Sequence, residues 1–192
     1  MKPKLTIDCD GVIADWLASF RGYIHGCTGI PMTKLTSPDS WLFGQQWGLS
    51  DREFAQWFEK FEESGGYTRC PQIKDARQTI QRLHALDYEI AFATARGTSK
   101  QMNGCSQTQA RIDTVLWLRD GGFPLAPLHF TNKKTDVMGD ILLDDATHHL
   151  EAWRATGRRA VCFSQTWNQD WDGERVYSHN EFLSLVLGGV SA

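Results

Sequence analysis

The sequence is informative in what it lacks. No apolar run approaches the roughly 18 residues that a membrane-spanning helix needs, so we expect no membrane segment. The formal net charge is −3, which gives no electrostatic case for binding a nucleic-acid polymer. The five cysteines form no C-x-x-C pair, so we expect reduced thiols and a cytoplasmic location. Asp8 and Asp10 interrupt the first strand-like run, so we expect no signal peptide.

What is present suits a globular protein. Hydrophobic residues make up 41% of the 192-residue chain and charged residues 22%, a balance unlike that of a disordered protein. The length fits one domain of ordinary size with room for a small inserted subdomain.

Short buried strands alternate with helices along most of the chain. We expect strands over residues 5–7, 89–94, 128–131, 140–143 and 159–163. We expect helices over about 12–20, 50–64, 71–83, 109–120, 147–156 and 179–187, and a polar loop over about 97–108. This alternation predicts an α/β fold, a Rossmann-like three-layer α/β/α arrangement around a parallel sheet.

Residues 21–70 interrupt the alternation. Ser50 and Glu53 form a capping-box pattern that begins a helix inside this segment. We predict a small, mainly helical cap over 21–70, inserted after the first strand–helix unit of a core formed by 1–20 and 71–192. A segment of this size can form a lid over the carboxyl edge of the sheet.

The cap segment carries aromatic side chains of two kinds. Those at positions 54, 57, 58 and 61 recur at helical spacing, and we expect this stripe to pack the cap rather than bind a ligand. Trp41, Phe43 and Trp47 lie in irregular structure between glycines and prolines. These three residues are better candidates for stacking on a base.

Acidic and hydroxyl side chains follow the predicted strands at the point where each strand ends. They are Asp8 and Asp10 after the first strand, Thr94 at the end of the second, and Asp144 and Asp145 after the fourth. The carboxyl ends of parallel strands share one edge of a sheet, where ligands bind. Carboxylates gathered there repel one another unless a hard divalent cation binds them, and oxygen ligands favour Mg²⁺ over zinc. The sequence therefore predicts a magnesium site that also holds phosphate.

These residue types suit phosphoryl chemistry. An aspartate can attack phosphorus to form an acyl phosphate, and a second acid two residues on can protonate the leaving oxygen and then activate water. A hydroxyl and a lysine can bind the phosphoryl oxygens, roles open to Thr94 and to Lys134 or Lys133. Spacing to the acidic pair at 144–145 favours Lys134.

Four short motifs resemble those of the haloacid dehalogenase (HAD) superfamily. They are Asp8-Cys9-Asp10-Gly11-Val12, Thr94, Lys134 and Gly139-Asp140-Ile141-Leu142-Leu143-Asp144-Asp145. All four occur in the order of that superfamily, each at the end of a predicted strand or in the loop before one. The combination is more specific than an isolated D-x-D pair.

Within this superfamily the chain is similar to the 5'(3')-deoxyribonucleotidase family over about residues 5–187. The similarity rests on Asp8–Trp16 (DCDGVIADW), Lys134-Thr135, Gln165–Asn168 (QTWN) and Arg175–Tyr177. It is weaker in the cap segment and over 97–108. The resemblance implies an HAD-like fold and release of phosphate from a nucleoside monophosphate.

The resemblance also implies a role for each matching residue. Asp8 would be the nucleophile, Asp10 the general acid and base, and Thr94 and Lys134 the phosphate-binding residues. The implied ligands of Mg²⁺ are Asp8, Asp10 through its backbone carbonyl, Asp144 directly or through water, and Asp145 in support.

Other residues are candidates for contacts with the rest of the substrate. The resemblance implies that Trp16 stacks near the base or sugar. Ala95 and Arg96 follow Thr94 where that family often carries another small hydroxyl residue or a similar pair, so we group both with the substrate-binding candidates. Adjacent histidines on a helix point about 100° apart, so we expect His148 and His149 to be surface residues rather than ligands of one ion.

Two other functions stay open on sequence alone. One is an HAD phosphatase of a sugar phosphate or another small phosphomonoester. The other is a binding protein that keeps the fold without turnover, although the complete set of acids, threonine and lysine argues against it. In each case we expect a small-molecule partner, no nucleic-acid polymer and no membrane, and a homodimer is compatible with the sequence.

Overall fold

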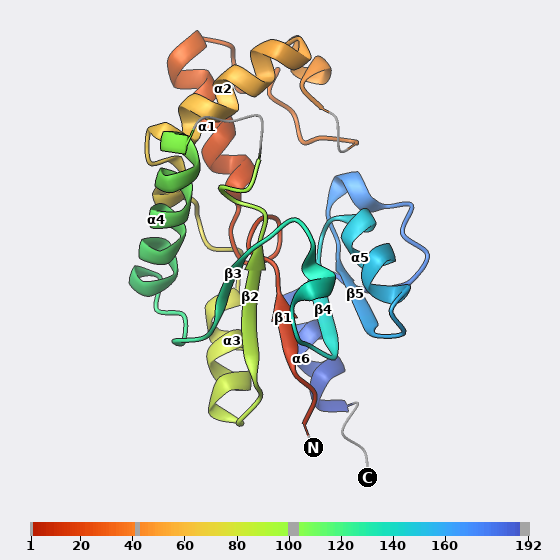
Figure 1. Ribbon diagram of the computed structural model, residues 1–192. Coiled ribbons are helices and arrows are strands. Elements are labelled where there is room, and N and C mark those ends of the chain that lie inside the picture. The colour runs from red at the N-terminus through yellow and green to blue at the C-terminus, as the bar shows by residue number, and fades with distance from the viewer. Residues whose placement is uncertain (1, 41–42, 100–103, 189–192) are drawn as a thin grey trace.

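The computed structural model describes residues 2–40, 43–99 and 104–188 (Figure 1). In that part of the chain, six strands form one parallel sheet in the order β3-β2-β1-β4-β5-β6. The strands are β1 (Leu5–Ile7), β2 (Ile90–Thr94), β3 (Leu128–Phe130), β4 (Ile141–Asp144), β5 (Arg159–Phe163) and β6 (Glu174–Val176). The α-helices are α1 (Trp16–Thr28), α2 (Asp51–Glu63), α3 (Ala76–Ala85), α4 (Gly104–Asp120), α5 (Thr147–Arg154) and α6 (His179–Gly188). The 3₁₀ turns are η1 (Gln45–Trp47), η2 (Gly66–Arg69), η3 (Lys134–Asp136) and η4 (Thr166–Asn168).

Apolar side chains occupy both faces of the sheet, as the period of two in a strand allows. On β4, Ile141 and Leu143 belong to the larger hydrophobic cluster, whereas Leu142 belongs to the smaller one. The larger cluster includes side chains of α3, α4 and α6, and the smaller one includes Leu150 and Trp153 of α5. Helices therefore cover both faces, and the predicted three-layer α/β/α fold is confirmed.

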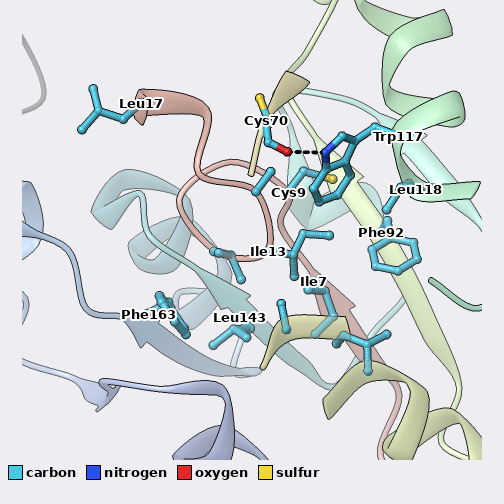
Figure 2. Close-up of a cluster of buried hydrophobic side chains, with 14 of the residues drawn as sticks. Ile7, Cys9, Ile13, Leu17, Cys70, Phe92, Trp117, Leu118, Leu143 and Phe163 are labelled. Carbon is cyan, nitrogen blue, oxygen red and sulfur yellow. Dashed lines mark hydrogen bonds between the residues drawn. The ribbon is translucent and has the colours of Figure 1, made fainter. Parts of the chain in front are cut away.

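The larger cluster supports the loop that follows β1. Figure 2 shows Cys9 and Ile13 of this loop beside Ile7, and all three side chains are fully buried. The same view shows Trp117 of α4, whose Nε1 donates a hydrogen bond to the carbonyl of Cys70 at 2.7 Å. The acidic residues at positions 8 and 10 therefore project from a loop whose neighbours are fixed in the core.

Three helices begin at positions that differ from those predicted. The first begins at Trp16 rather than near Val12, because Gly11 turns the chain at φ +70° and Asp15 caps the helix through the N–H of Ala18. Val12 is buried in the intervening turn instead.

The other two differences lie at α3 and α4. The third helix begins at Ala76 rather than Pro71, because Ile73 donates its N–H to the carbonyl of Ile13 in extended structure and Asp75 has φ +62°. The α4 helix begins at Gly104, so the polar loop expected over 97–108 is shorter.

The sequence did not predict β6. This strand has three residues, Glu174–Val176, and lies at the edge of the sheet beside β5. Its residues are mostly polar, and the alternation of a three-residue strand is too short to recognise. Glu174 is exposed and Arg175 is half-buried, so the strand has no apolar run like that of β5.

The cap helices lie beyond the carboxyl ends of the strands, at the top of Figure 1. The predicted capping box of Ser50 and Glu53 is present at the start of α2. Phe20 of α1 packs edge-on against Phe54 and Phe58 of α2, with ring centroids 5.5 and 5.4 Å apart. Because α1 continues through position 20, the proposed division between core and cap falls inside a helix.

Among the described residues, no helix is both long enough and apolar enough to cross a membrane.

Candidate active site

Three carboxylates from the carboxyl edge of the sheet converge in the structure. Asp8 follows β1, Asp144 ends β4 and Asp145 follows it, and one oxygen of each lies within 4.8 Å of the others. The two segments are joined by a hydrogen bond from the N–H of Asp8 to the carbonyl of Leu143 at 2.9 Å. Pairing of β1 with β4 therefore brings together acids that are more than 130 positions apart in the sequence.

Lys134 is the cation inside this cluster. It lies on η3, is 3% exposed, and its Nζ is 2.6 Å from Asp8 Oδ1 and 2.5 Å from Asp144 Oδ2. Lys133 instead lies at the surface and pairs with Asp136 at 2.8 Å. The structure therefore places Lys134, which the spacing favoured, at the site and Lys133 away from it.

The cluster has more carboxylates than positive charges, and the pKa values of its acids reflect this. Burial, together with Asp144 and Asp10, raises the pKa of Asp8 to about 7, although Lys134 opposes the shift. Burial and the neighbouring charges of Asp8 and Asp144 raise the pKa of Asp145 well above its usual range. One lysine does not balance three buried carboxylates, so the cluster favours a further cation.

Asp145 is held by a close approach of the backbone and by two side chains. Gly11 lies so near that an added Cβ would be 2.3 Å from Asp145 Oδ2. Trp167 donates Nε1 to the same oxygen at 3.0 Å, and Asn168 donates Nδ2 to the Asp145 carbonyl at 2.8 Å. The glycine of the first motif is therefore required by space as well as by its positive φ.

Asp10 lies beside the acidic cluster but has a different partner. Both of its carboxylate oxygens accept hydrogen bonds from Arg96, at 2.6 Å from Nη2 and 2.9 Å from Nε. Arg96 was a substrate-binding candidate from its position after Thr94. The structure places Arg96 at the cavity wall, with its guanidinium buried and paired with Asp10.

A cavity of about 280 Å³ lies between the acidic cluster and the cap. Its walls include Asp8, Asp10, Lys134, Asp144, Asp145, Trp16, Phe43, Phe54, Phe58, Ala95 and Arg96. The structure thus brings most of the predicted site residues to one space. It also brings Phe54 and Phe58 there, so two members of the stripe expected to pack the cap both pack it and face the cavity.

Two of the predicted site residues that the structure describes are not on the walls. Thr94 is fully buried, and its Oγ1 accepts a hydrogen bond from the N–H of Arg96 at 3.3 Å. Trp47 is buried in the cap, where its Nε1 donates to the carbonyl of Thr36 at 2.9 Å. Trp41 lies outside the described residues.

Other wall residues were not among the site residues predicted from the sequence. Glu62 of α2 and Tyr67 of η2 lie in the same wall region, and burial raises the pKa of Glu62 to about 7. His149 lines the cavity although it was expected at the surface, and burial lowers its pKa to about 4, whereas His148 is exposed. Helical periodicity could have placed Glu62 on the face of Phe58, but not over a sheet edge distant in sequence.

Comparisons with known proteins identify the family of the chain. A family model described as "5' nucleotidase, deoxy (Pyrimidine), cytosolic type C protein" matches residues 2–191. A curated protein of Chlorobaculum tepidum, named "Putative 5'(3')-deoxyribonucleotidase", is 24% identical over 187 residues, which cover 96% of this chain and 90% of that protein.

Solved structures of low sequence identity share the fold. An HAD family hydrolase from Deinococcus radiodurans, solved with bound phosphate and sodium, superposes with a TM-score of 0.65 at 14% identity over 97% of this chain and 96% of that one. An HAD-superfamily hydrolase from Geobacter sulfurreducens gives a TM-score of 0.53 at 15% identity over 96% of each chain. The resemblance to the HAD superfamily is confirmed at the level of the fold.

Proposed function

Because the chain belongs to the cytosolic type C 5'-nucleotidase family and is a phosphatase, we propose that it is a Mg²⁺-dependent 5'(3')-(deoxy)ribonucleotidase. It releases phosphate from nucleoside monophosphates through an aspartyl-phosphate on Asp8. The observation that carries the proposal is the buried cluster of Asp8, Asp144, Asp145 and Lys134, which opens on a cavity walled by aromatic rings.

The donor set fits Mg²⁺. Its three converging side chains offer only carboxylate oxygens, the ligands that this hard cation prefers. We assign Asp8, Asp144 and Asp145 to hold the ion by their side chains and Asp10 by its backbone carbonyl. When bound, the ion supplies positive charge that offsets the charges of the carboxylates and of the substrate phosphate.

In the first step an oxygen of Asp8 forms a bond to phosphorus. The bond from phosphorus to the leaving oxygen breaks, and that oxygen takes a proton from Asp10, so the nucleoside departs as an alcohol. Lys134 holds the phosphoryl oxygens. The lysine is already within hydrogen-bond distance of the attacking carboxylate, at 2.6 Å, and so lies beside the position where phosphate charge develops.

In the second step water attacks the phosphorus of the acyl phosphate. Asp10 accepts a proton from this water, the bond between phosphorus and Asp8 breaks, and inorganic phosphate leaves. The carboxylate of Asp8 is regenerated, and Asp10 returns to its protonated form for the next turnover. The overall change is one phosphomonoester and one water converted to one alcohol and one phosphate.

The aromatic walls support a nucleoside as the alcohol. Trp16 and Phe43 lie 6.0 Å apart between ring centroids, and Phe58 meets Trp16 edge-on at 5.9 Å. Such rings stack on a planar base with little loss of side-chain entropy. The proposal includes a small-molecule substrate and a cytoplasmic location. Whether the protein forms a homodimer is a separate question for a measurement of its mass in solution.

A substrate panel tests this function. Purified protein is given nucleoside 5'- and 3'-monophosphates, sugar phosphates and a generic aryl phosphate in Mg²⁺, and released phosphate is measured. We expect a nucleoside monophosphate to give the highest kcat/KM. We also expect Asp8→Asn to lose at least about 10³-fold in kcat, whereas Asp136→Asn, an exposed control, keeps full activity. Preference for a sugar phosphate would overturn the nucleotidase function in favour of a sugar-phosphate phosphatase. Failure to release phosphate from any substrate would overturn both functions.

A further inference from the structure

The guanidinium of Arg96 is fixed from several directions at once. Its side chain has no exposed surface, and two of its nitrogens hold the carboxylate of Asp10. Nη1 donates to Thr114 Oγ1 of α4 at 3.3 Å. A planar, permanently charged fork with these partners has one favourable position, so the position of Asp10 is tied to it.

The remaining face of Arg96 is covered by a ring from the cap side. Arg96 Cζ lies 4.1 Å from the centroid of Tyr67, a distance at which a cation is attracted to an aromatic face. The hydroxyl of Tyr67 donates to Glu62 Oε1 at 3.1 Å. Tyr67 and Glu62 are 2% and 1% exposed, so water does not compete for these contacts.

Glu62 lies near the end of cap helix α2, one residue after Phe61, which packs against Phe20 at 5.3 Å. A continuous line of buried contacts thus runs from the cap core through Glu62, Tyr67 and Arg96 to Asp10. Each link joins a different segment of the chain: α2, η2, the loop after β2 and the loop after β1.

We propose that Tyr67 and Glu62 are positioning residues that set the place of the Asp10 carboxyl through Arg96. The inference rests on the proposed function only in giving Asp10 a part in proton transfer. The guanidinium of Arg96 is held between Asp10 and the Tyr67 ring. If the ring is displaced, the guanidinium can tilt toward the cavity, and Asp10 moves with it. The cap therefore contributes to the proton-transfer step as well as to binding of the substrate.

Tyr67→Phe is the test, because it removes one hydroxyl and keeps the ring. We expect kcat for a nucleoside monophosphate to fall about fivefold to tenfold with KM changed less than about twofold, the pattern of a contact used in the transition state. For an aryl phosphate, whose leaving oxygen needs little protonation, we expect the first step, measured as the burst of released aryl alcohol, to lose less than about twofold. Glu62→Gln should give the same pattern.

Tyr23→Phe is the matched control. Tyr23 lies in the same aromatic cluster, 5.7 Å from Phe61, and does not line the catalytic cavity. Its loss of a hydroxyl should leave the rates with both substrates within about twofold of wild type. Equal losses in Tyr23→Phe and Tyr67→Phe would show general loosening of the cap and would overturn the proposal.

A double-mutant cycle separates positioning from a purely structural role. In an Asp10→Asn background, Tyr67→Phe should have no further effect on kcat, since the group it positions is gone. Additive losses would overturn the inference. The same four proteins unfolded in urea should show non-additive midpoints, a readout that needs no turnover.

Failure of the inference differs from failure of the proposed function. A wild-type protein that hydrolyses nucleotides while Tyr67→Phe and Glu62→Gln match it would overturn the positioning role alone. A wild-type protein that releases phosphate from no substrate, with the non-additive urea midpoints still present, would overturn the proposed function and with it any catalytic purpose of the link.

Discussion

The carboxyl edge of the sheet and the cap above it bury different kinds of side chain. The edge buries formal charges, three carboxylates and one lysine, with distances near 2.5 Å between paired atoms. The cap buries uncharged rings that meet at 4.8 to 6.5 Å between centroids, as Phe20 does with Phe54 and Phe58. One region is held by electrostatics and the other by packing.

This difference separates how the two regions respond to change. A buried charge must keep its partner, because an unpaired ion in the interior costs several kcal/mol. An aromatic core accepts many sets of rings of similar volume. We infer that the edge carries the reacting groups and tolerates few substitutions, whereas the aromatic rings of the cap set the substrate and tolerate more of them, apart from the Glu62–Tyr67 link to Arg96.

Removing Lys134, the cation at the sheet edge, should have the largest effect and is the strongest test of this difference. Lys134→Met leaves Asp8 and Asp144 without their shared partner, and we expect a loss of about 3–5 kcal/mol in the free energy of unfolding. Activity should also fall at least about 10²-fold. Urea unfolding and phosphate release measure the two effects. The matched control Lys133→Met, whose lysine is exposed, should stay within about 0.5 kcal/mol of wild type.

Adding the missing positive charge should have the next largest effect. Mg²⁺ at 100 times its Kd should stabilise the wild type by about 2.7 kcal/mol, and chelation should abolish both the stabilisation and the activity. Thermal unfolding with and without the ion measures the shift. Asp145→Asn should reduce the Mg²⁺-dependent shift, whereas Phe61→Leu should lower stability and keep the shift whole. A full shift in Asp145→Asn would remove this residue from the ligand set.

A wall residue of the cap tests the other side of the comparison. Phe58→Leu removes a ring that faces the cavity, and we expect KM for a nucleoside monophosphate to rise about threefold to tenfold with kcat little changed. Trp57→Phe is the control, because Trp57 belongs to the same stripe but does not line the cavity. If kcat rather than KM fell in Phe58→Leu, the separation of reaction from substrate would be too simple.

The smallest expected effect concerns Glu62, a buried carboxyl that the cap contributes to the cavity. Burial raises the pKa of Glu62 from 4.5 to about 7, so the folded protein binds this proton more tightly than the unfolded chain. The resulting stabilisation is complete below pH 4.5 and is lost as the pH rises to about 7. The Tm of Glu62→Gln should therefore rise relative to that of wild type as the pH increases across this window. The expected difference is about 2–4 °C for each kcal/mol of stability that the wild type loses. Parallel Tm curves for the two proteins would contradict the raised pKa.

The sequence predicted the edge far better than the cap, for a physical reason. Asp8 and Asp144 follow short apolar runs, and the rule that parallel strands end at one edge brings them together without further information. Lys134 was favoured over Lys133 by spacing alone, and the structure places it between the two acids.

What escaped prediction depends on packing between distant segments. The pairing of Arg96 with Asp10 requires α4 and Tyr67 to enclose the guanidinium, which no local pattern reveals. Phe54 and Phe58 share one stripe with Trp57, yet only contact with the sheet edge decides which rings face the cavity. The late start of α1 followed from the turn at Gly11, whose purpose is visible only beside Asp145.

The hydrogen bond from Trp167 to Asp145 has an optical consequence. Indole emission responds to the electric field at the ring, and this ring lies 3.0 Å from one of the acids proposed to hold the metal. Any ion or phosphate that changes the charge near Asp145 should shift the emission that disappears in Trp167→Phe. The protein thus carries its own fluorescent reporter, so occupancy of the site can be followed in real time without a label or a coupled assay.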